Sequence, residues 1–286
     1  MALAKVADGV VINADSAQVY RDLPILSAAP SAEERSAVEH RLYGVRDGAD
    51  PCSAAEWAAL AKREIAEVHA SGQLPILAGG TGLYLRTLIE GIAPVPLIAT
   101  EVRERVRGQP VASNLAELQD LDPAAAKRLD PSDSTRIGRA LEVVLSTGRT
   151  LADWQSRREG GIGARVAMRP LILLPPRAWL YQRCDRRFHD MVEAGAVEEV
   201  KALLARKLEP SLPLMRAIGV REIADFLAGT VDRDEMVRRG QQATRNYAKR
   251  QYTWFAHQPP PDWPRFTKAL DASRMGEALA LIQPKA

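Results

Sequence analysis

Hydrophobic and polar positions follow two periods along the first part of the chain, and these periods predict strands that alternate with helices. Residues 9–14 and 74–78 are short apolar runs typical of buried parallel strands. Residues 54–70 carry apolar side chains at helical spacing, with Ser53 as the expected N-cap. A shorter helix is expected over residues 83–91. The order of these elements predicts an α/β fold with a doubly wound parallel sheet.

A change of pattern marks a helical segment in the middle of the chain. Between about residue 94 and residue 161 we find no convincing buried strand. Three amphipathic helices, several with Asp or Ser caps, are expected there over residues 114–121, 124–129 and 134–147. We therefore predict an α/β core formed by residues 1–95 and 162–286, with residues 96–161 as a helical insertion subdomain.

The pattern after this segment predicts a third buried strand over residues 169–175. Further helices are expected over residues 177–207, 215–228, 233–256 and 274–283. At the other end, the segment ALAKVADG is typical of the last turns of a helix. A parallel sheet normally has a strand before such a helix, so we expect a preceding strand and turn that the sequence does not contain. A short free N-terminal helix is the alternative.

Composition places the chain among globular proteins and excludes several other classes. It has 286 residues, 46% hydrophobic and 26% charged, with a formal net charge of +3. It has no apolar run long enough for a transmembrane helix and no signal-peptide pattern, so we expect a cytoplasmic protein without membrane contact. Cys52 and Cys184 form no metal or redox spacing. Arginine clusters, such as Arg183, Arg186 and Arg187, are either solvated helix faces or parts of a phosphate-binding surface.

Two polar turns follow the first two predicted strands. Asp15 and Ser16 come directly after residues 9–14, and Gly79-Gly80-Thr81-Gly82 follows residues 74–78. Ligands of doubly wound sheets bind outside the carboxyl ends of the strands. Asp15 could accept a proton or hold a metal there, and the Thr81 hydroxyl could bind a phosphate or a nucleophile. A helix cap or an ordinary turn is the alternative for each.

Other sequence signals are absent or ambiguous. The phosphate-binding pattern G-x-x-x-x-G-K-[ST] does not occur, the four histidines lack metal-ligand spacing, and no Ser-His-Asp arrangement stands out. Residues 245–255 interleave basic and aromatic side chains. Such a segment suits phosphate contact with base stacking, or a helix whose aromatic residues enter the core while its basic residues face water.

Five segments taken together resemble the tRNA dimethylallyltransferases, a family of tRNA-modifying enzymes. They are residues 12–20, 79–84, 135–143, 215–222 and 247–255, and the matches run in family order from about residue 2 to residue 256. The family's phosphate-binding loop is missing from the sequence. The segment 25–30 also departs from the family pattern, with Ala29 or a neighbour where the family has a lysine.

The resemblance implies a sheet like that of the P-loop NTPases, with the first strand and phosphate loop missing. It also implies transfer of the dimethylallyl group from dimethylallyl diphosphate to N6 of the adenosine 3′ of the anticodon. The tRNAs would be those that read codons beginning with U. Mg²⁺ would assist the leaving diphosphate, and the target base would be flipped out of the anticodon stem-loop. A monomer is expected.

The resemblance also assigns roles to single residues. Asp15 matches the general base, and Thr81 matches a residue that hydrogen-bonds near the amine and the diphosphate. Arg216 and Arg221 are the candidates for binding the diphosphate. The segments that match tRNA contacts comprise Asp15, Ser16, Ala17, Gln18, Arg103, Thr135, Arg136, Ile137, Gly138 and Arg139. The helical insertion matches the subdomain that holds the anticodon arm, and no metal ligand is assigned.

Three hypotheses follow for the function of the chain. The first is a tRNA dimethylallyltransferase that lacks its N-terminal module in this sequence. The second is a truncated, catalytically inactive remnant that still binds tRNA. The third is a prenyltransferase of free adenine nucleotides or a relative of small-molecule kinases, against which the insertion and the segment 135–139 argue. We favour the first.

Overall fold

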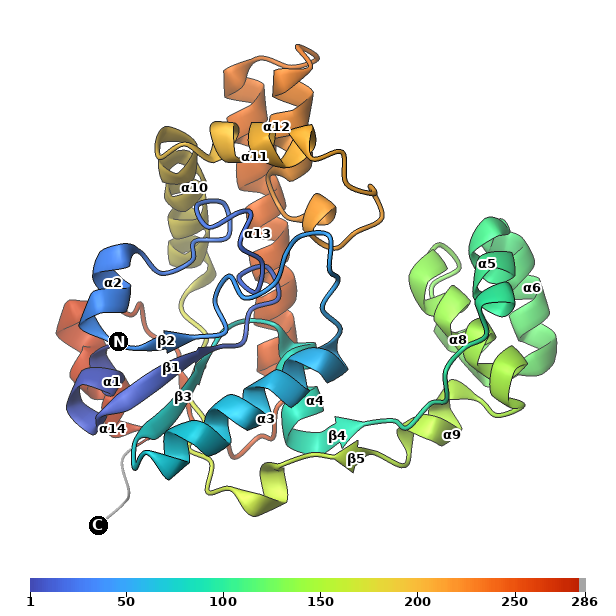
Figure 1. Ribbon diagram of the computed structural model, residues 1–286, viewed down its shortest axis with the longest axis horizontal. Coiled ribbons are helices and arrows are strands. Elements are labelled where there is room, and N and C mark those ends of the chain that lie inside the picture. The colour runs from blue at the N-terminus through green and yellow to red at the C-terminus, as the bar shows by residue number, and fades with distance from the viewer. Residues whose placement is uncertain (283–286) are drawn as a thin grey trace. The chain divides into compact units, whose positions relative to one another are not determined.

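The computed structural model describes residues 1–282, and the chain divides into two compact units (Figure 1). Unit 1 comprises Met1–Leu88 and Arg165–Ala286, and unit 2 comprises Ile89–Ala164. Unit 2 contains the predicted insertion, residues 96–161, and extends beyond it at both ends.

A parallel sheet of three strands forms the centre of unit 1. β1 (Gly9–Asn13) lies between β2 (His40–Arg41) and β3 (Leu74–Ala78). β1 and β3 pair in parallel along their whole length, so the carboxyl ends of the two strands lie side by side. Both strands agree with the prediction, but β3 is not fully buried. Among the described residues it is one of the two edge strands of this sheet, with β2 at the other edge, and Leu74 is 42% exposed.

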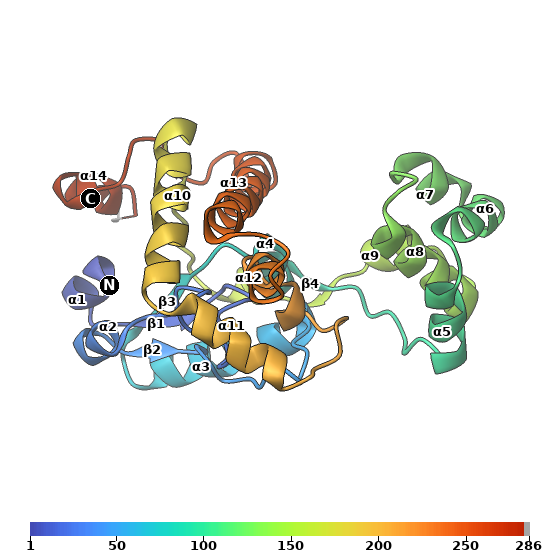
Figure 2. The same ribbon diagram turned by 90° about the horizontal axis from the view of Figure 1, so that it is seen from above.

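Helices of unit 1 cover both faces of the sheet. Figure 2 shows α3 on one side, with α10 and α13 on the other. The helices are α1 (Ala2–Ala7), α2 (Ala32–Ala37), α3 (Ala54–Ala70), α4 (Gly82–Glu90, which ends at the border of unit 2), α10 (Arg177–Glu193), α11 (Ala196–Ala205), α12 (Val220–Leu227), α13 (Arg233–His257) and α14 (Met275–Ala280). Short 3-10 turns lie at η2 (Leu214–Arg216) and η3 (Ala272–Arg274), and a third, η1 (Gly163–Arg165), spans the border with unit 2.

Helix α3 forms as its sequence predicts and supports the end of β1. Ser53 and Glu56 make the reciprocal hydrogen bonds of a capping box at its first turn. Trp57 is fully buried, and its ring stacks on Tyr84 of α4 at a centroid distance of 4.6 Å. The indole N–H donates to the Asn13 carbonyl at 2.9 Å. The last residue of β1 is therefore fixed by a side chain from α3.

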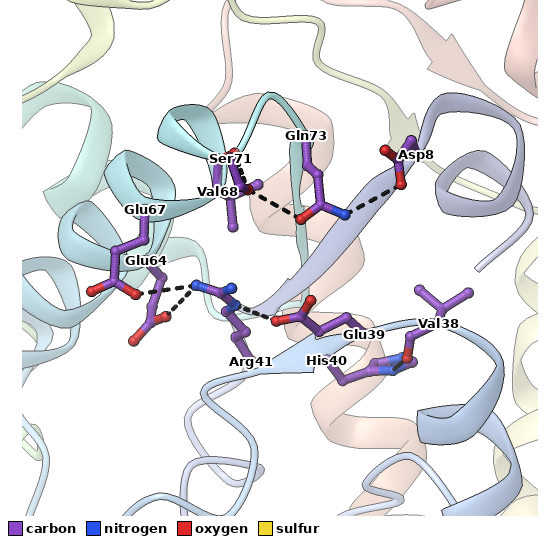
Figure 3. A network of polar contacts seen from close by, with 10 residues as sticks. All are labelled: Asp8, Val38, Glu39, His40, Arg41, Glu64, Glu67, Val68, Ser71 and Gln73. Carbon is purple, nitrogen blue, oxygen red and sulfur yellow. Dashed lines mark hydrogen bonds and ion pairs between the residues drawn. The ribbon is translucent and has the colours of Figure 1, made fainter.

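A polar network ties α3 to the edge strand β2 (Figure 3). The Arg41 guanidinium contacts the carboxylates of Glu64 and Glu67 on α3, each at 3.2 Å. Beyond the same helix, the Gln73 amide donates to the Asp8 carboxylate at 3.2 Å. These contacts are partly or largely exposed, so we expect them to set the helix position more than to add stability.

Three predictions for the second half of the chain are corrected by the structure. The helix expected over residues 177–207 is two helices, because Gly195 takes a positive φ of 107° between α10 and α11. The helix expected over residues 215–228 is likewise interrupted at Gly219, whose φ is 95°. The strand expected over residues 169–175 is shorter than predicted.

The third strand of the prediction does not join β1 and β3. Only Ile172–Leu173 (β6) forms a strand, and it pairs in parallel with Arg265–Phe266 (β7) as a separate sheet. The helix predicted over residues 274–283 corresponds to α14, and position 283 lies outside the described residues.

Unit 2 is mainly helical, with its own core. Its helices are α5 (Thr100–Gly108), α6 (Val111–Leu121), α7 (Pro123–Arg128), α8 (Ser134–Thr147) and α9 (Leu151–Gln155). The pattern predicted α6, α7 and α8 but missed α5, α9 and the short antiparallel pair of β4 (Gly91–Ile92) with β5 (Glu159–Gly160). The Asp122 and Asp133 side chains cap α7 and α8. Leu118, Ile137 and Leu141 are fully buried in the core.

Candidate functional site

The turn after β1 and the turn after β3 are joined by hydrogen bonds beyond the strands themselves. Ala14 N donates to the Ala78 carbonyl at 2.8 Å, and Thr81 N donates to the Ala14 carbonyl at 3.2 Å. The Thr81 hydroxyl then accepts from Ser16 N at 2.9 Å. The two polar turns predicted from sequence, around Asp15 and Thr81, therefore form one site at the carboxyl edge of the sheet.

The glycines of the second turn are required by close packing. A Cβ on Gly79 would lie under 3.0 Å from the backbone of Ala14, closer than real side chains approach. A Cβ on Gly80 would collide with the Gln251 amide of α13, and that amide donates to the Gly80 carbonyl at 3.0 Å. The turn therefore lies between the end of β1 and helix α13, and the backbone of Ala14 leaves no room for a side chain at Gly79.

Asp15 is held by a turn of its own. Its Oδ1 accepts from Ala17 N at 2.9 Å, and its backbone N–H donates to Asn13 Oδ1 at 2.7 Å. The fully buried Asn13 amide also donates to the carbonyls of Asp15, at 2.9 Å, and Leu42, at 3.1 Å. No hydrogen bond within residues 1–282 uses Asp15 Oδ2. This oxygen is therefore available to accept a proton from a ligand.

Two tyrosines and an arginine lie within electrostatic reach of Asp15. Burial first, and the Asp15 charge second, raise the pKa of Tyr43 to about 12. The same two causes raise the pKa of Tyr247, although hydrogen bonds with Thr81 and another residue of α13 oppose them. Desolvation lowers the pKa of Arg187, and the Asp15 charge opposes this shift. Arg187 is nevertheless an exposed residue, so a ligand could reach it.

Sequence analysis missed the part of the site that comes from α10 and α13. Arg187 lies in an arginine cluster noted from the sequence, and Tyr247 and Gln251 lie in the segment of interleaved basic and aromatic residues. Neither pattern identified the residue that approaches Asp15, because the approach joins segments more than a hundred residues apart in the chain. No sequence pattern pointed to Tyr43 as a residue of the site.

Arg216 and Arg221, the predicted diphosphate ligands, lie on η2 and α12. Both are exposed, and no hydrogen bond or ion pair within the described residues joins them to Asp15 or Thr81. Gln18 lies closer to the site in the chain, and its amide donates to the carbonyls of Ser27, at 3.0 Å, and Ala28, at 2.7 Å.

The predicted tRNA contacts of unit 2 divide into exposed and buried positions. Ile137 is fully buried in the core, and Gly138 is buried and has no side chain. Only the other members of this set present side chains to solvent: Arg103, Thr135, Arg136 and Arg139. Arg136 pairs with Asp133 at 3.0 Å, so its guanidinium is partly neutralised.

The structure gives no set of side chains that fits a metal ion. Among residues 1–282 no group of three or more His, Cys, Asp or Glu side chains could hold one. Two surface hollows of about 380 and 400 Å³ lie elsewhere, and none of the predicted site residues lines them. No helix in the described part of the chain is long and apolar enough to cross a membrane.

Comparison with known protein families gives a match over most of the chain. The model of the family described as IPP transferase matches residues 18–258. A tRNA dimethylallyltransferase of Erythrobacter litoralis is 64% identical over 258 residues, which cover 90% of this chain and 81% of that protein. A tRNA dimethylallyltransferase of Novosphingobium aromaticivorans is 60% identical over 276 residues, which cover 96% of this chain and 98% of that protein.

Solved structures of the same kind share the fold. The full-length tRNA isopentenylpyrophosphate transferase of Bacillus halodurans superposes with a TM-score of 0.69 at 31% identity, covering 98% of this chain and 88% of that one. A eukaryotic dimethylallyltransferase acting on tRNA gives a TM-score of 0.74 at 27% identity, covering 88% of this chain and 64% of that one. The extent of these matches and the joined turns of Asp15 and Thr81 lead to one conclusion: the chain belongs to the IPP transferase family.

Proposed function

We propose that this chain is a tRNA dimethylallyltransferase. It moves the dimethylallyl group of dimethylallyl diphosphate to N6 of the adenosine 3′ of the anticodon, in tRNAs that read codons beginning with U. Relatives at 60–64% identity carry the name of this activity. The observation that carries the proposal is that the turn of Asp15 and the turn of Thr81 are joined, through the hydrogen bond from Ser16 N to Thr81 Oγ1 at 2.9 Å.

The reaction forms one bond and breaks one bond. The adenosine N6 attacks C1 of the dimethylallyl group, and the bond from C1 to the diphosphate oxygen breaks. N6 loses one proton, which Asp15 accepts through its unused Oδ2, while the diphosphate leaves with the electron pair of the broken bond. A carboxylate suits this role because the exocyclic amine becomes acidic only as the new bond forms.

Positive charge is needed where the diphosphate departs. Arg187 meets this need best, because it is within electrostatic reach of Asp15 and is an exposed residue. Arg216 and Arg221 remain candidates for the same role. The Thr81 hydroxyl accepts from Ser16 N and donates to the Ser16 hydroxyl at 3.2 Å, so it orders the turn that the amine approaches.

We also expect Mg²⁺ to act on the diphosphate. No group of three or more His, Cys, Asp or Glu side chains among residues 1–282 could hold it as a protein-bound ion. Any Mg²⁺ would have to bind chiefly through diphosphate oxygens, as this ion often does with phosphate substrates.

The exposed residues of unit 2 are proposed to contact the anticodon stem-loop. Arg103, Arg136 and Arg139 are cations on helices α5 and α8, and Thr135 adds a hydroxyl at the first turn of α8. Phosphate contacts of this kind position a nucleic acid without reading its sequence. We expect the protein to act as a monomer.

The test is prenyl transfer by the purified chain to an unmodified anticodon stem-loop with a 3′ adenosine, in the presence of dimethylallyl diphosphate and Mg²⁺. We expect transfer by the wild type, and a loss of about a hundredfold or more for Asp15→Ala. The control is Asp50→Ala, which removes an exposed carboxylate outside the site.

Two results would contradict the proposal. Stem-loop binding without any transfer would support the inactive, tRNA-binding remnant instead. Transfer to free AMP in preference to the stem-loop would identify a prenyltransferase of nucleotides. Full activity of Asp15→Ala would leave the reaction in place but remove Asp15 as its base.

A further inference from the structure

The loop over residues 22–30 carries backbone groups that reach the site, although it contains no helix or strand. Leu23 and Leu26 anchor it in the core, at 1% and 7% exposure. Ala28 has a φ of 53°, in the left-handed region that a residue with a side chain rarely adopts. Such a conformation persists only where surrounding contacts determine it.

One carboxylate holds the N–H side of this loop. Glu199 on α11 accepts from Ile25 N at 2.8 Å with Oε1, and from Leu26 N at 2.9 Å with Oε2. Burial raises the pKa of Glu199, and the hydrogen bonds from these two N–H groups oppose that shift. Two such bonds from consecutive N–H groups to one carboxylate fix direction as well as distance. Glu199 therefore sets both the position and the tilt of these two peptide units.

The carbonyl side of the same loop holds two residues of the site. The Ser27 carbonyl accepts from Arg187 at 3.3 Å and from Gln18 at 3.0 Å, and the Ala28 carbonyl accepts from Gln18 at 2.7 Å. Arg187 and Gln18 have no other hydrogen-bond acceptor among the described residues. The orientation of both side chains thus depends on a loop whose opposite side is held by Glu199.

We propose that Glu199 is a positioning residue, which acts through residues 25–28 to aim Arg187 and Gln18 at the substrates. Glu199 itself touches neither the turn of Asp15 nor that of Thr81 in any described hydrogen bond or ion pair. The inference rests on the proposed function, because it assigns Arg187 to the diphosphate. It predicts that loss of the carboxylate weakens diphosphate binding more than it lowers the rate of the bound complex.

The kinetic test compares Glu199→Gln and Glu199→Ala with Glu198→Gln, a neighbouring exposed acid in the same first turn of α11. We expect KM for dimethylallyl diphosphate to rise roughly tenfold in Glu199→Ala, with a smaller change in kcat, and Glu199→Gln to recover part of the loss. Glu198→Gln should behave as the wild type. A roughly tenfold fall of kcat in Glu199→Ala, with KM for dimethylallyl diphosphate unchanged, would overturn the proposal.

A double-mutant cycle tests whether the effect passes through Arg187. If it does, adding Glu199→Ala to Arg187→Lys should raise KM by much less than the product of the two single effects, because Arg187→Lys already removes the aimed guanidinium. If KM of the double variant rose by the full product of the two single increases, Glu199 would not act through Arg187.

A third measurement needs no activity and separates this inference from the proposed function. Amide hydrogen exchange of the peptide with Ile25 and Leu26 should be at least tenfold faster in Glu199→Ala than in the wild type and in Glu198→Gln. Unchanged exchange would overturn the inference even if transfer is confirmed. If exchange is faster in Glu199→Ala but the wild type transfers no prenyl group, the contact between Glu199 and the loop is supported and the proposed function is rejected.

Discussion

The site of unit 1 and the predicted contact segment of unit 2 are built in opposite ways. Around Asp15, buried backbone groups and glycines fix the turns, and the important contacts join β1, β3 and α13. On α8, local helix geometry divides the residues, with Ile137 buried inside and Arg136 and Arg139 outside. Tertiary contacts between separate elements determine the first region. In the second, the helical period of α8 alone determines which side chains are buried and which are exposed.

This difference decides how each region should respond to substitution. At the turn of Gly79 in unit 1, a small added group has no free space and must move the backbone on which the chemistry depends. In unit 2 an exposed side chain can be removed without disturbing the core beneath it, so its loss should change only what the surface binds. Glycine substitutions in the two units give the sharpest contrast.

The largest effect is expected for Gly79→Ala. Its Cβ would lie under 3.0 Å from the backbone of Ala14, so the turn of Thr81 must move away from that of Asp15. A displacement of about 1 Å at a reacting site can lower the reaction rate about a hundredfold, so we expect a loss of prenyl transfer of that order. Prenyl transfer to the stem-loop measures it, with Gly276→Ala in α14 as control, since nothing lies within 4 Å of a Cβ there. Wild-type activity of Gly79→Ala would show that the two turns need not stay joined.

A smaller effect is expected when Arg136 and Arg139 are both changed to Ala. Affinity for the stem-loop should fall roughly tenfold at low salt, and the slope of log K against log salt should become shallower by about 0.7 to 0.9 for each lost phosphate contact. Arg128→Ala, an exposed arginine of α7, is the control. An unchanged salt slope in the double variant would mean that this face of α8 does not meet RNA phosphates.

Features with local causes were predicted well from the sequence. Ser53 and Glu56 stand at the spacing of a capping box, and the structure has that box at the start of α3. The strands over residues 9–14 and 74–78 also form, because short apolar runs next to turn residues suffice to specify them. Pairing of the two polar turns then follows from the parallel arrangement of their strands.

Features that depend on partners elsewhere in the chain were not predicted. The run over residues 169–175 is as apolar as the others, but only Ile172–Leu173 finds a paired strand, near the C-terminal end of unit 1. Gly195 and Gly219 each interrupt a helical pattern, and nothing local distinguishes them from a tolerated helix glycine. Arg187 comes within electrostatic reach of Asp15 through the tertiary packing of α10, which lies against α13.

A gain of stability is expected for Gly138→Ala, which contrasts directly with Gly79→Ala. The added Cβ would meet only Val106 Cγ1, at 3.6 Å, an ordinary contact distance. Since Gly138 lies inside α8, alanine should stabilise unit 2 by about 0.5–1 kcal/mol through its higher helix propensity. Denaturant unfolding measures it, and a loss of stability instead would show that the core of unit 2 has no room beside Val106.

The smallest effect concerns the acids that complete capping boxes in the two units, Glu56 on α3 and Asp153 on α9. Hydrogen bonds from Ser53, its backbone N–H first, hold the pKa of Glu56 below 4.5. Bonds from Thr150, its hydroxyl first, hold the pKa of Asp153 below 3.8. Each ionised acid therefore stabilises the folded state above its ordinary pKa, and the contribution disappears as the pH falls through the lowered value.

The two helices should reveal this loss differently, because α3 buries Trp57 whereas α9 buries no residue. Glu56→Gln should lower the melting temperature of unit 1 slightly at pH 7, and by less as the pH falls below the ordinary pKa of a glutamate, while Asp153→Asn should only speed amide exchange within α9 at neutral pH. Glu101→Gln in α5, a helix without a side-chain cap, should show neither change. If Asp153→Asn lowered the melting temperature as much as Glu56→Gln, α9 would have to unfold together with the core of its unit, and the contrast between tertiary and local construction would fail at this helix.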